Sequence, residues 1–230
     1  MKFGLSEEIY IKIKNVLKNF SQYKFKIFGS RARGDYKNNS DIDSIIIVAD
    51  SVWHYKICNW IKEYKISKFI SFALPGSTRQ ESLINGLKVC ANLSKNFSDG
   101  VIIHDAVRPL VRSSLISECL NKLKEADGCM PILPVNDTIY LSNDGKSITS
   151  LLDRNLLYAG QSPEAFNLCK YLKINLELSK EEIFSVKGSS EIAFRKNLNI
   201  ALISGDEVNF KLTTPVDLKR FETIIKEENK

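Results

Sequence analysis

The chain has 230 residues, 43% of them hydrophobic and 26% charged, which is ordinary for a globular protein of one large or two small domains. A net charge of +6 suits a protein that handles phosphates, but the lysines form no dense tract, so nucleic acid is not an expected partner. No apolar run approaches the roughly 20 residues of a membrane span, and the first residues lack the apolar core of a signal peptide. We therefore expect a cytoplasmic protein with no membrane partner.

Alternating strands and helices are predicted along the chain. Short apolar segments beside turn residues predict strands over residues 24–29, 42–48, 68–75, 100–105 and 128–136. Apolar residues at helical spacing predict helices over residues 6–20, 52–64, 80–93 and 110–126. Because the two kinds of element alternate, we expect an α/β fold with a mostly parallel, Rossmann-like sheet and helices on both faces.

One segment breaks this alternation. Residues 138–154 alternate in part between apolar and polar, and contain Asn143-Asp144-Gly145, a strong hairpin signal. We expect a protruding β-hairpin arm at about residues 137–155. Five widely spaced cysteines without a CxxC pair indicate buried thiols rather than a zinc site.

Polar side chains follow several of the predicted strands, where open α/β sheets bind their ligands. Asp105 is the last residue of the predicted strand at 100–105, and could be either a ligand-binding carboxylate or a helix cap. Lys211, in Asn-Phe-Lys-Leu-Thr-Thr-Pro, offers a point charge to a phosphate, or is an exposed surface lysine. Arg154 has a fork that suits a phosphate acceptor, or pairs with a nearby acid.

Four segments in the last two-thirds of the chain, taken together, resemble one known family. They cover residues 75–83, 101–110, 134–139 and 208–219. In this order and at these spacings they resemble the 2-C-methyl-D-erythritol 4-phosphate cytidylyltransferase family and its relatives that act on ribitol phosphate. The resemblance covers about residues 41–230 and implies a sheet of the nucleotide-diphospho-sugar transferase type.

The resemblance also implies an activity and partners. Such enzymes transfer CMP from CTP to an alditol phosphate, release pyrophosphate and use Mg²⁺, and in them the hairpin arm builds a homodimer. A methylerythritol phosphate acceptor would place the protein in isoprenoid precursor synthesis. A ribitol phosphate acceptor would place it in cell-wall or capsule synthesis.

Site residues are carried over from the matching motifs. Val-Ile-Ile-His-Asp-Ala-Val-Arg-Pro matches the family's HDAARP, which implies that Asp105 lies beside the ribose, the phosphates and the metal. Lys211 matches N-x-K-x-T-x-P and would meet a phosphate. The nucleotide-binding residues implied are Gly76, Ser77, Arg79, Ser82 and Ala106. The acceptor-binding residues implied are Arg108, Thr138, Arg154, Ser162 and Thr213, with Thr138 and Arg154 supplied by the partner chain.

Two departures fall in the acceptor region. Gln161-Ser162-Pro163-Glu164 stands where the family has Q-T-P-Q, which keeps a hydroxyl at Ser162. Residues 186–190 stand where the family has a Thr-Asp-Asp/Glu cluster, so the identity of the alditol is left open.

Residues 1–40 do not match the family, whose members open with A-A-G-x-G-x-R. The chain instead has Ile-Phe-Gly-Ser-Arg-Ala-Arg-Gly at 27–34, followed by Asp41-Ile42-Asp43, and this string resembles minimal nucleotidyltransferases of the DNA polymerase β superfamily. Three hypotheses remain open. The preferred one is that this segment replaces the family's phosphate loop. The second is that Asp41 and Asp43 form the two-metal site of a polymerase β-type enzyme, and the third is that the protein binds nucleotide or dimerises without catalysis. The loop would use Gly29, Ser30, Arg31 and Arg33, with Arg33 in a catalytic role.

Overall fold

The computed structural model describes residues 42, 44–94, 96 and 99–228, so the predictions for residues 6–34 and for Asp41 and Asp43 lie outside it. The described strands are β1 (Ile45–Val48), β2 (Phe69–Ala73), β3 (Gly100–Ile103), β4 (Gly128–Pro134), β5 (Tyr140–Leu141), β6 (Ser150–Leu151), β7 (Tyr158–Gly160), β8 (Glu164–Asn167) and β9 (Ile200–Ser204). The described helices are α2 (Ser51–Glu63), α3 (Arg79–Leu93), α4 (Ser113–Lys122), α5 (Leu168–Leu176), α6 (Lys180–Ser185), α7 (Ser189–Arg195), α8 (Pro215–Glu228) and the short 3₁₀ helix η2 (Arg154–Leu156). None of the helices in this part of the chain is both long and apolar enough to cross a membrane.

The α/β class is confirmed, but the strand directions in the larger sheet are mixed, whereas the sequence analysis expected a mostly parallel sheet. Strands β1 and β2 pair in parallel, as do β4 and β9, whereas β8 runs antiparallel to both β3 and β4, and β7 antiparallel to β4. The antiparallel strands are those that follow the arm, over residues 158–167. They return from the arm without a crossover helix, and a parallel pairing needs such a crossover.

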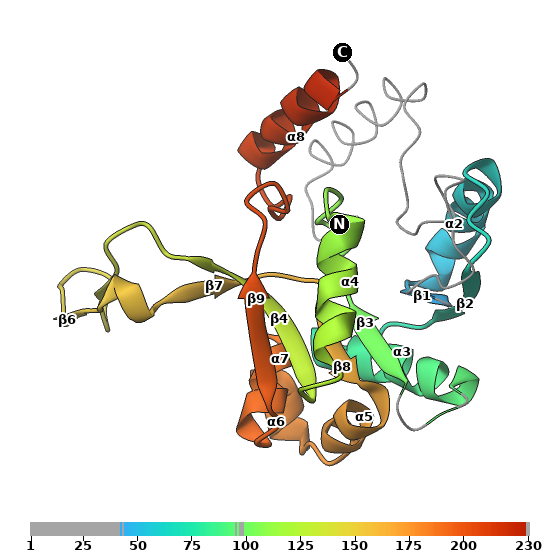
Figure 1. The fold of residues 1–230 in the computed structure, drawn as a ribbon, viewed down its shortest axis with the longest axis horizontal. Coiled ribbons are helices and arrows are strands. Elements are labelled where there is room, and N and C mark those ends of the chain that lie inside the picture. Colours follow the sequence, from blue (N-terminus) through green and yellow to red (C-terminus); the bar gives the residue numbers. More distant parts are fainter. Residues whose placement is uncertain (1–41, 43, 95, 97–98, 229–230) are drawn as a thin grey trace.

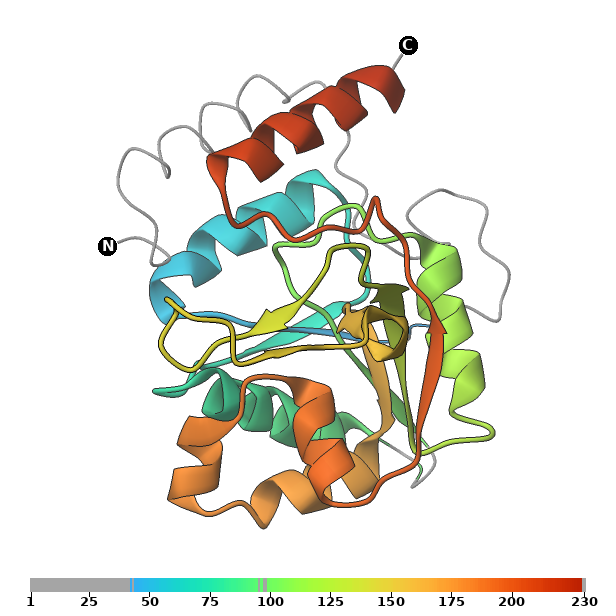
Figure 2. The ribbon, with the colours of Figure 1, turned by 90° about the vertical axis from the view of Figure 1, so that its left-hand side faces the viewer.

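Helices cover both faces of the larger sheet (Figure 1), and the view turned by 90° shows the same arrangement (Figure 2). Strand β8 shows why, because its neighbouring residues Ala165 and Phe166 are both fully buried on opposite faces. Ala165 packs in a core with residues of α4, and Phe166 packs in a second core with residues of α3, α5 and α7. The Phe166 ring stacks on Tyr171 with centroids 4.0 Å apart. A Cβ at residue 128 of β4 would lie 2.6 Å from the Phe166 ring, so Gly128 is required there.

The hairpin arm is present where the sequence predicts it. Tyr140 pairs with Leu151 in the antiparallel β5–β6 ladder, and Gly145 has a positive φ of 68° at the turn. The Asp144 carboxylate accepts hydrogen bonds from the backbone N–H of Lys146 and Ser147, which lowers the pKa of Asp144. Figure 1 shows the arm projecting beyond β7, on the opposite side of the sheet from β3.

Candidate active site

The candidate site is built around Asp105, which follows β3. Strand β8 pairs antiparallel with β3, with Glu164 opposite Ile103, so the residues just before β8 lie beside the residues just after β3. As a result the Asp105 N–H donates to the Ser162 hydroxyl at 3.1 Å, across 57 positions of sequence. Sheet pairing therefore fixes the backbone from which the Asp105 carboxylate projects.

Three cationic side chains meet this carboxylate. Lys211 Nζ lies 3.2 Å from Oδ2, Arg79 Nη2 lies 3.6 Å from Oδ1, and Arg108 Nε lies 3.9 Å from Oδ2. Arg79 is the first residue of α3, Arg108 lies in the turn after β3, and Lys211 lies in the segment between β9 and α8. We call Asp105, Arg79, Arg108 and Lys211 the Asp105 cluster. Three positive charges around one carboxylate leave an excess of positive charge, which suits the binding of phosphates.

These cations set the protonation of Asp105. Partial burial acts to raise the pKa of this carboxyl, but Lys211 first, then Arg79 and Arg108, together hold the pKa below its ordinary value. The stability that this interaction contributes is complete above the unfolded-state pKa and is lost as pH falls through the lower folded-state pKa. The carboxylate is therefore ionised throughout the neutral range.

The charge balance can be tested without any substrate. We expect the ¹³C carboxyl resonance of Asp105 to titrate below the ordinary aspartate pKa of 3.8. In Lys211→Met the pKa of Asp105 should rise, because the cation that lowers this pKa most is gone while the desolvation that raises it remains. An unchanged titration in this variant would contradict the ion pair, and Lys219→Met, which alters an exposed lysine of α8, is the control.

Arg108 is fixed by the segment that carries Lys211. Arg108 Nη1 donates to the Asn209 carbonyl at 2.7 Å, and Leu212 N–H donates to the Val107 carbonyl at 2.8 Å. Asn209 is completely buried, and its Nδ2 donates to the Ser162 carbonyl at 2.7 Å. These bonds tie the turn after β3, the start of β8 and the Lys211 segment into one unit.

Asn209 and Gln161 were missed as site residues by the sequence analysis. Gln161 exchanges two hydrogen bonds with the backbone of Asp206, at 3.0 Å each. Both belong to motifs that the sequence analysis quoted, Asn209 two positions before Lys211 and Gln161 one position before Ser162. Their positions inside these motifs could have marked them as site residues. Their role is to hold the backbone, since buried polar groups must find partners.

The Ser162 hydroxyl donates its hydrogen to His104. His104 Nε2 lies 3.0 Å from the Arg108 carbonyl, which can only accept, so Nε2 carries the hydrogen. Desolvation lowers the pKa of His104, which keeps the ring neutral and leaves Nδ1 as an acceptor for the Ser162 hydroxyl at 3.2 Å. The Ser162 oxygen in turn accepts from Asp105 N–H. Ser162 therefore orients the Asp105 backbone.

The predicted base-binding turn at Gly76–Ser82 is closed by its own side chains. Gly76 N–H donates to the Ser82 hydroxyl at 3.0 Å, and Ser77 N–H donates to Glu81 Oε2 at 2.6 Å. The Ser77 hydroxyl also donates to Glu81, and these bonds lower the pKa of Glu81. Glu81, which the sequence analysis did not single out, thus sets the shape of this turn. Ala106 is exposed beside Asp105.

In the part of the chain that the structure describes, no hydrogen bond or ion pair joins three of the predicted acceptor-binding residues to the Asp105 cluster. Arg154 lies at the base of the arm in η2, where its Nη1 donates to the Asn136 carbonyl at 3.0 Å. Thr138 lies on the same arm. Thr213 donates its hydroxyl and its N–H to Asp217 Oδ2, at 3.0 and 2.9 Å, at the start of α8. Within this one chain, Thr213 stabilises a helix terminus.

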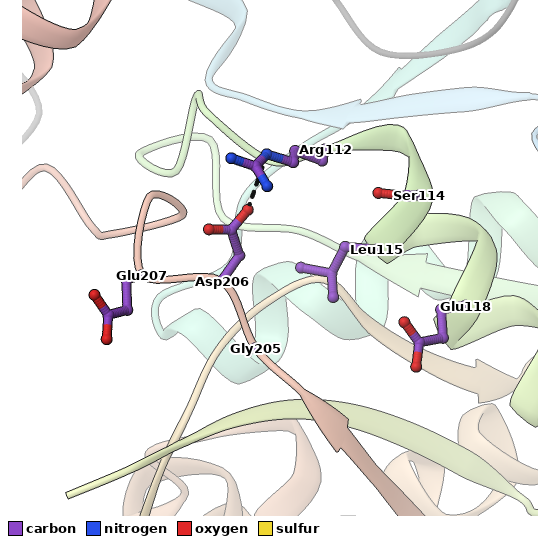
Figure 3. A pocket seen from close by; sticks show the side chains of 7 residues that line it. All are labelled: Arg112, Ser114, Leu115, Glu118, Gly205, Asp206 and Glu207. Atoms are coloured by element: carbon purple, nitrogen blue, oxygen red, sulfur yellow. Dashed lines mark ion pairs between the residues drawn. The ribbon is translucent and has the colours of Figure 1, made fainter.

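A separate cavity of about 380 Å³ lies between the start of α4 and residues 205–207 (Figure 3). Arg112 and Asp206, which face each other across it, form an ion pair at 3.2 Å. The cavity shares no residue with the Asp105 cluster. Because its arginine is already paired and its other charges are acidic, it is less suited to phosphates than the cluster.

An α/β sheet with a carboxylate and several cations just beyond the end of a strand is typical of nucleotidyltransferases that bind polyphosphate beside a sheet edge. The chain belongs to the IspD family, 2-C-methyl-D-erythritol 4-phosphate cytidylyltransferase, whose model matches residues 30–227. The match includes every residue of the Asp105 cluster, and it begins at residue 30, about ten residues before the start that the sequence analysis gave to the resemblance, so that of the proposed phosphate-loop residues only Gly29 lies outside it.

Relatives with two different names resemble the chain. It is 31% identical over 161 residues to a 2-C-methyl-D-erythritol 4-phosphate cytidylyltransferase of Trichormus variabilis, covering 70% of this chain and 68% of the relative. It is 26% identical over 189 residues to a ribitol-5-phosphate cytidylyltransferase of Streptococcus agalactiae serotype Ia, covering 82% and 79%. The family is thereby established.

Solved structures show the same fold. The 4-diphosphocytidyl-2C-methyl-D-erythritol synthase of Anaerococcus prevotii superposes with a TM-score of 0.70 at 23% identity, covering 80% of this chain and 79% of that one. The Francisella tularensis 2-C-methyl-D-erythritol 4-phosphate cytidylyltransferase superposes with a TM-score of 0.67 at 20% identity, covering 87% and 90%.

Proposed function

We propose that the protein transfers CMP from CTP to an alditol phosphate and releases pyrophosphate. The observation that carries this proposal is the convergence of Lys211, Arg79 and Arg108 on the Asp105 carboxylate, in a chain of the cytidylyltransferase family. An oxygen of the acceptor phosphate attacks the α-phosphorus of CTP. The new O–P bond forms as the bond to the β-phosphate bridging oxygen breaks, and its electron pair leaves with pyrophosphate.

The chain's own contribution is electrostatic. Two phosphorylated substrates must approach each other, and charge shifts onto the leaving pyrophosphate as the reaction proceeds. Fixed cations neutralise this charge without having to reorganise. Arg108 is the least exposed of the three, at 13%, and is held by the Asn209 carbonyl, whereas the Lys211 side chain is 45% exposed and presents its charge to a bound phosphate.

Asp105 fits a role as the protein ligand of Mg²⁺. The described part of the chain contains no group of three or more metal-ligating side chains. Mg²⁺ at nucleotide sites needs only one or two carboxylates, because substrate phosphates and water complete its shell. Asp105, ionised and partly exposed at the cluster, is such a carboxylate. The ion would draw phosphate oxygens together and neutralise their charge.

We propose that the acceptor is one of two alditol phosphates, 2-C-methyl-D-erythritol 4-phosphate or ribitol 5-phosphate, the two named in the relatives. Pyrophosphate release should be measured with CTP and Mg²⁺ and each acceptor in turn. We expect release with one acceptor, little with the other and none without an acceptor. Silence with both in a folded protein would contradict the proposed function.

We further propose a homodimer in which the arm reaches the partner's cluster. Large aliphatic side chains of the arm are exposed, with Leu156 76%, Ile148 67% and Leu151 63% exposed. Apolar side chains gathered on a projecting arm are typical of an association surface. The arm projects away from the strand that leads to its own Asp105 (Figure 1), so Arg154 and Thr138 would serve a second copy.

The N-terminal hypotheses also stand as proposals, since their residues lie outside the described part of the chain. We propose that Gly29, Ser30, Arg31 and Arg33 supply the triphosphate loop that the family forms with A-A-G-x-G-x-R. Arg33→Ala should then raise the KM for CTP by roughly tenfold or more, as the loss of a charged phosphate contact does. A KM equal to that of the wild type would rule out this role for Arg33.

A further inference from the structure

Glu164 is a buried carboxylate that none of the site predictions includes. It is the first residue of β8, two positions after Ser162, and only 7% of it is exposed. Its Oε1 accepts a hydrogen bond from Ser190 N–H at 3.0 Å and a second, short one from the Ser190 hydroxyl. A carboxylate this deep is costly unless it is well satisfied, so its partners indicate what it does.

The partner of Glu164 is the first turn of α7. The N-cap residue of this helix is Gly188, which has no side chain to cap it. Glu164, from strand β8, accepts the Ser190 N–H instead. The contact fixes where α7 begins against the sheet. Tyr171 supports it from the other side by donating its hydroxyl hydrogen to the Ser189 carbonyl at 2.9 Å.

The start of α7 leads directly to the Asp105 cluster. Arg79 Nη2 donates to the Ser189 hydroxyl at 3.1 Å, and the same nitrogen lies 3.6 Å from Asp105 Oδ1. Ser189 is 1% exposed, so its hydroxyl has a fixed position. The guanidinium of Arg79, itself 45% exposed, is therefore held at Asp105 by a buried hydroxyl.

Glu164 also interacts electrostatically with a second residue of the cluster, Arg108. Desolvation lowers the pKa of Arg108, and attraction to both Asp105 and Glu164 opposes that change. Within the described residues Glu164 forms no ion pair as close as 4.0 Å, so its hydrogen bonds are its main direct support. In the sequence, Glu164 stands where the Q-T-P-Q pattern has its second Gln, and Ser189 and Ser190 lie in the stretch that stands in place of Thr-Asp-Asp/Glu.

We propose that Glu164 is a positioning residue for cytidylyl transfer: through Ser190 and Ser189 it sets the place of the Arg79 guanidinium at Asp105. The catalytic consequence of this inference rests on the proposed function. The structural link from Glu164 through Ser190 and Ser189 to Arg79 does not depend on it. Glu164 itself contacts no reacting atom in this scheme. It acts on the nucleotide side through Arg79.

The kinetic test compares Glu164→Ala, Glu164→Gln and the matched control Glu182→Ala. Glu182 accepts the Ser179 N–H at the start of α6, the neighbouring short helix, so its removal destabilises a helix start without touching the cluster. We expect Glu164→Ala to lower kcat/KM for CTP by roughly tenfold or more, with a raised KM for CTP, because a misplaced binding group weakens the reacting complex. Glu164→Gln, which keeps an acceptor oxygen, should recover most of this loss, and Glu182→Ala should match the wild type.

A double-mutant cycle identifies Arg79 as the intermediary. If Glu164 acts through Arg79, Glu164→Ala should cost little further activity in an Arg79→Ala background. A general loss of folded protein would lower kcat alone and leave the KM for CTP unchanged. Equal, multiplicative effects of Glu164→Ala in both backgrounds would overturn the proposal.

The same cycle measured by urea unfolding is independent of activity. We expect the shifts of the unfolding midpoint for Glu164→Ala and Arg79→Ala to be non-additive, because both remove support from the same turn of α7. Additive shifts would overturn the link even in an active enzyme. If the shifts are non-additive but the wild-type protein releases no pyrophosphate, the link between Glu164 and Arg79 is retained and the proposed function is rejected.

Discussion

Replacing Lys211 with alanine should lower turnover by about 10²- to 10³-fold, the range found when a single group that stabilises transition-state charge is removed. Lys211 Nζ lies 3.2 Å from Asp105, and the exposed side chain contributes nothing to either core. The fold should therefore be retained. The measurement is pyrophosphate release under saturating CTP, together with the midpoint of urea unfolding.

Lys219→Ala is the matched control, because Lys219 is an exposed lysine eight positions further along, on α8. It should leave both turnover and stability unchanged. Turnover of Lys211→Ala close to that of the wild type would remove Lys211 from the mechanism. That result would favour the polymerase β-type hypothesis, in which Asp41→Asn combined with Asp43→Asn abolishes activity.

Co-expression of two inactive variants should restore activity, if the arm of one subunit completes the site of the other. Lys211→Ala alters the cluster and Arg154→Ala alters the arm, and each alone should lose most of its turnover. In a mixed dimer, one of the two sites then combines an intact cluster with an intact arm. Random pairing should recover about a quarter of the wild-type activity.

Lys211→Ala combined with Arg79→Ala is the control for this experiment. Both residues belong to the cluster of one chain, so every site in the mixture lacks one of them and no activity should return. Analytical ultracentrifugation should show a dimer in each case. A monomer, or a lack of recovery in proven Lys211→Ala/Arg154→Ala mixed dimers, would contradict the shared site.

Much of the described fold was predictable because its signals are local. The four-residue apolar runs of β1 and β3 and the helical spacing in α3 depend only on neighbouring residues. The arm followed from one turn sequence around Gly145, whose positive φ few other residues adopt. Strands β7 and β8 were not predicted, because their short segments, Tyr158–Gly160 and Glu164–Asn167, have no clear period of their own.

The sequence by itself determined the family, the α/β class, the arm and the identity of Asp105, Lys211, Arg79 and Arg108 as candidates, because each is marked by a motif or a short period. Only the tertiary structure decided that these four side chains meet, since they come from segments separated by up to 132 positions, from residue 79 to 211. It also decided that Glu164 and Asn209 lie buried against the site. Long-range pairing of β8 with β3 and the docking of α7 produce those contacts, and neither leaves a periodic signal in the local sequence.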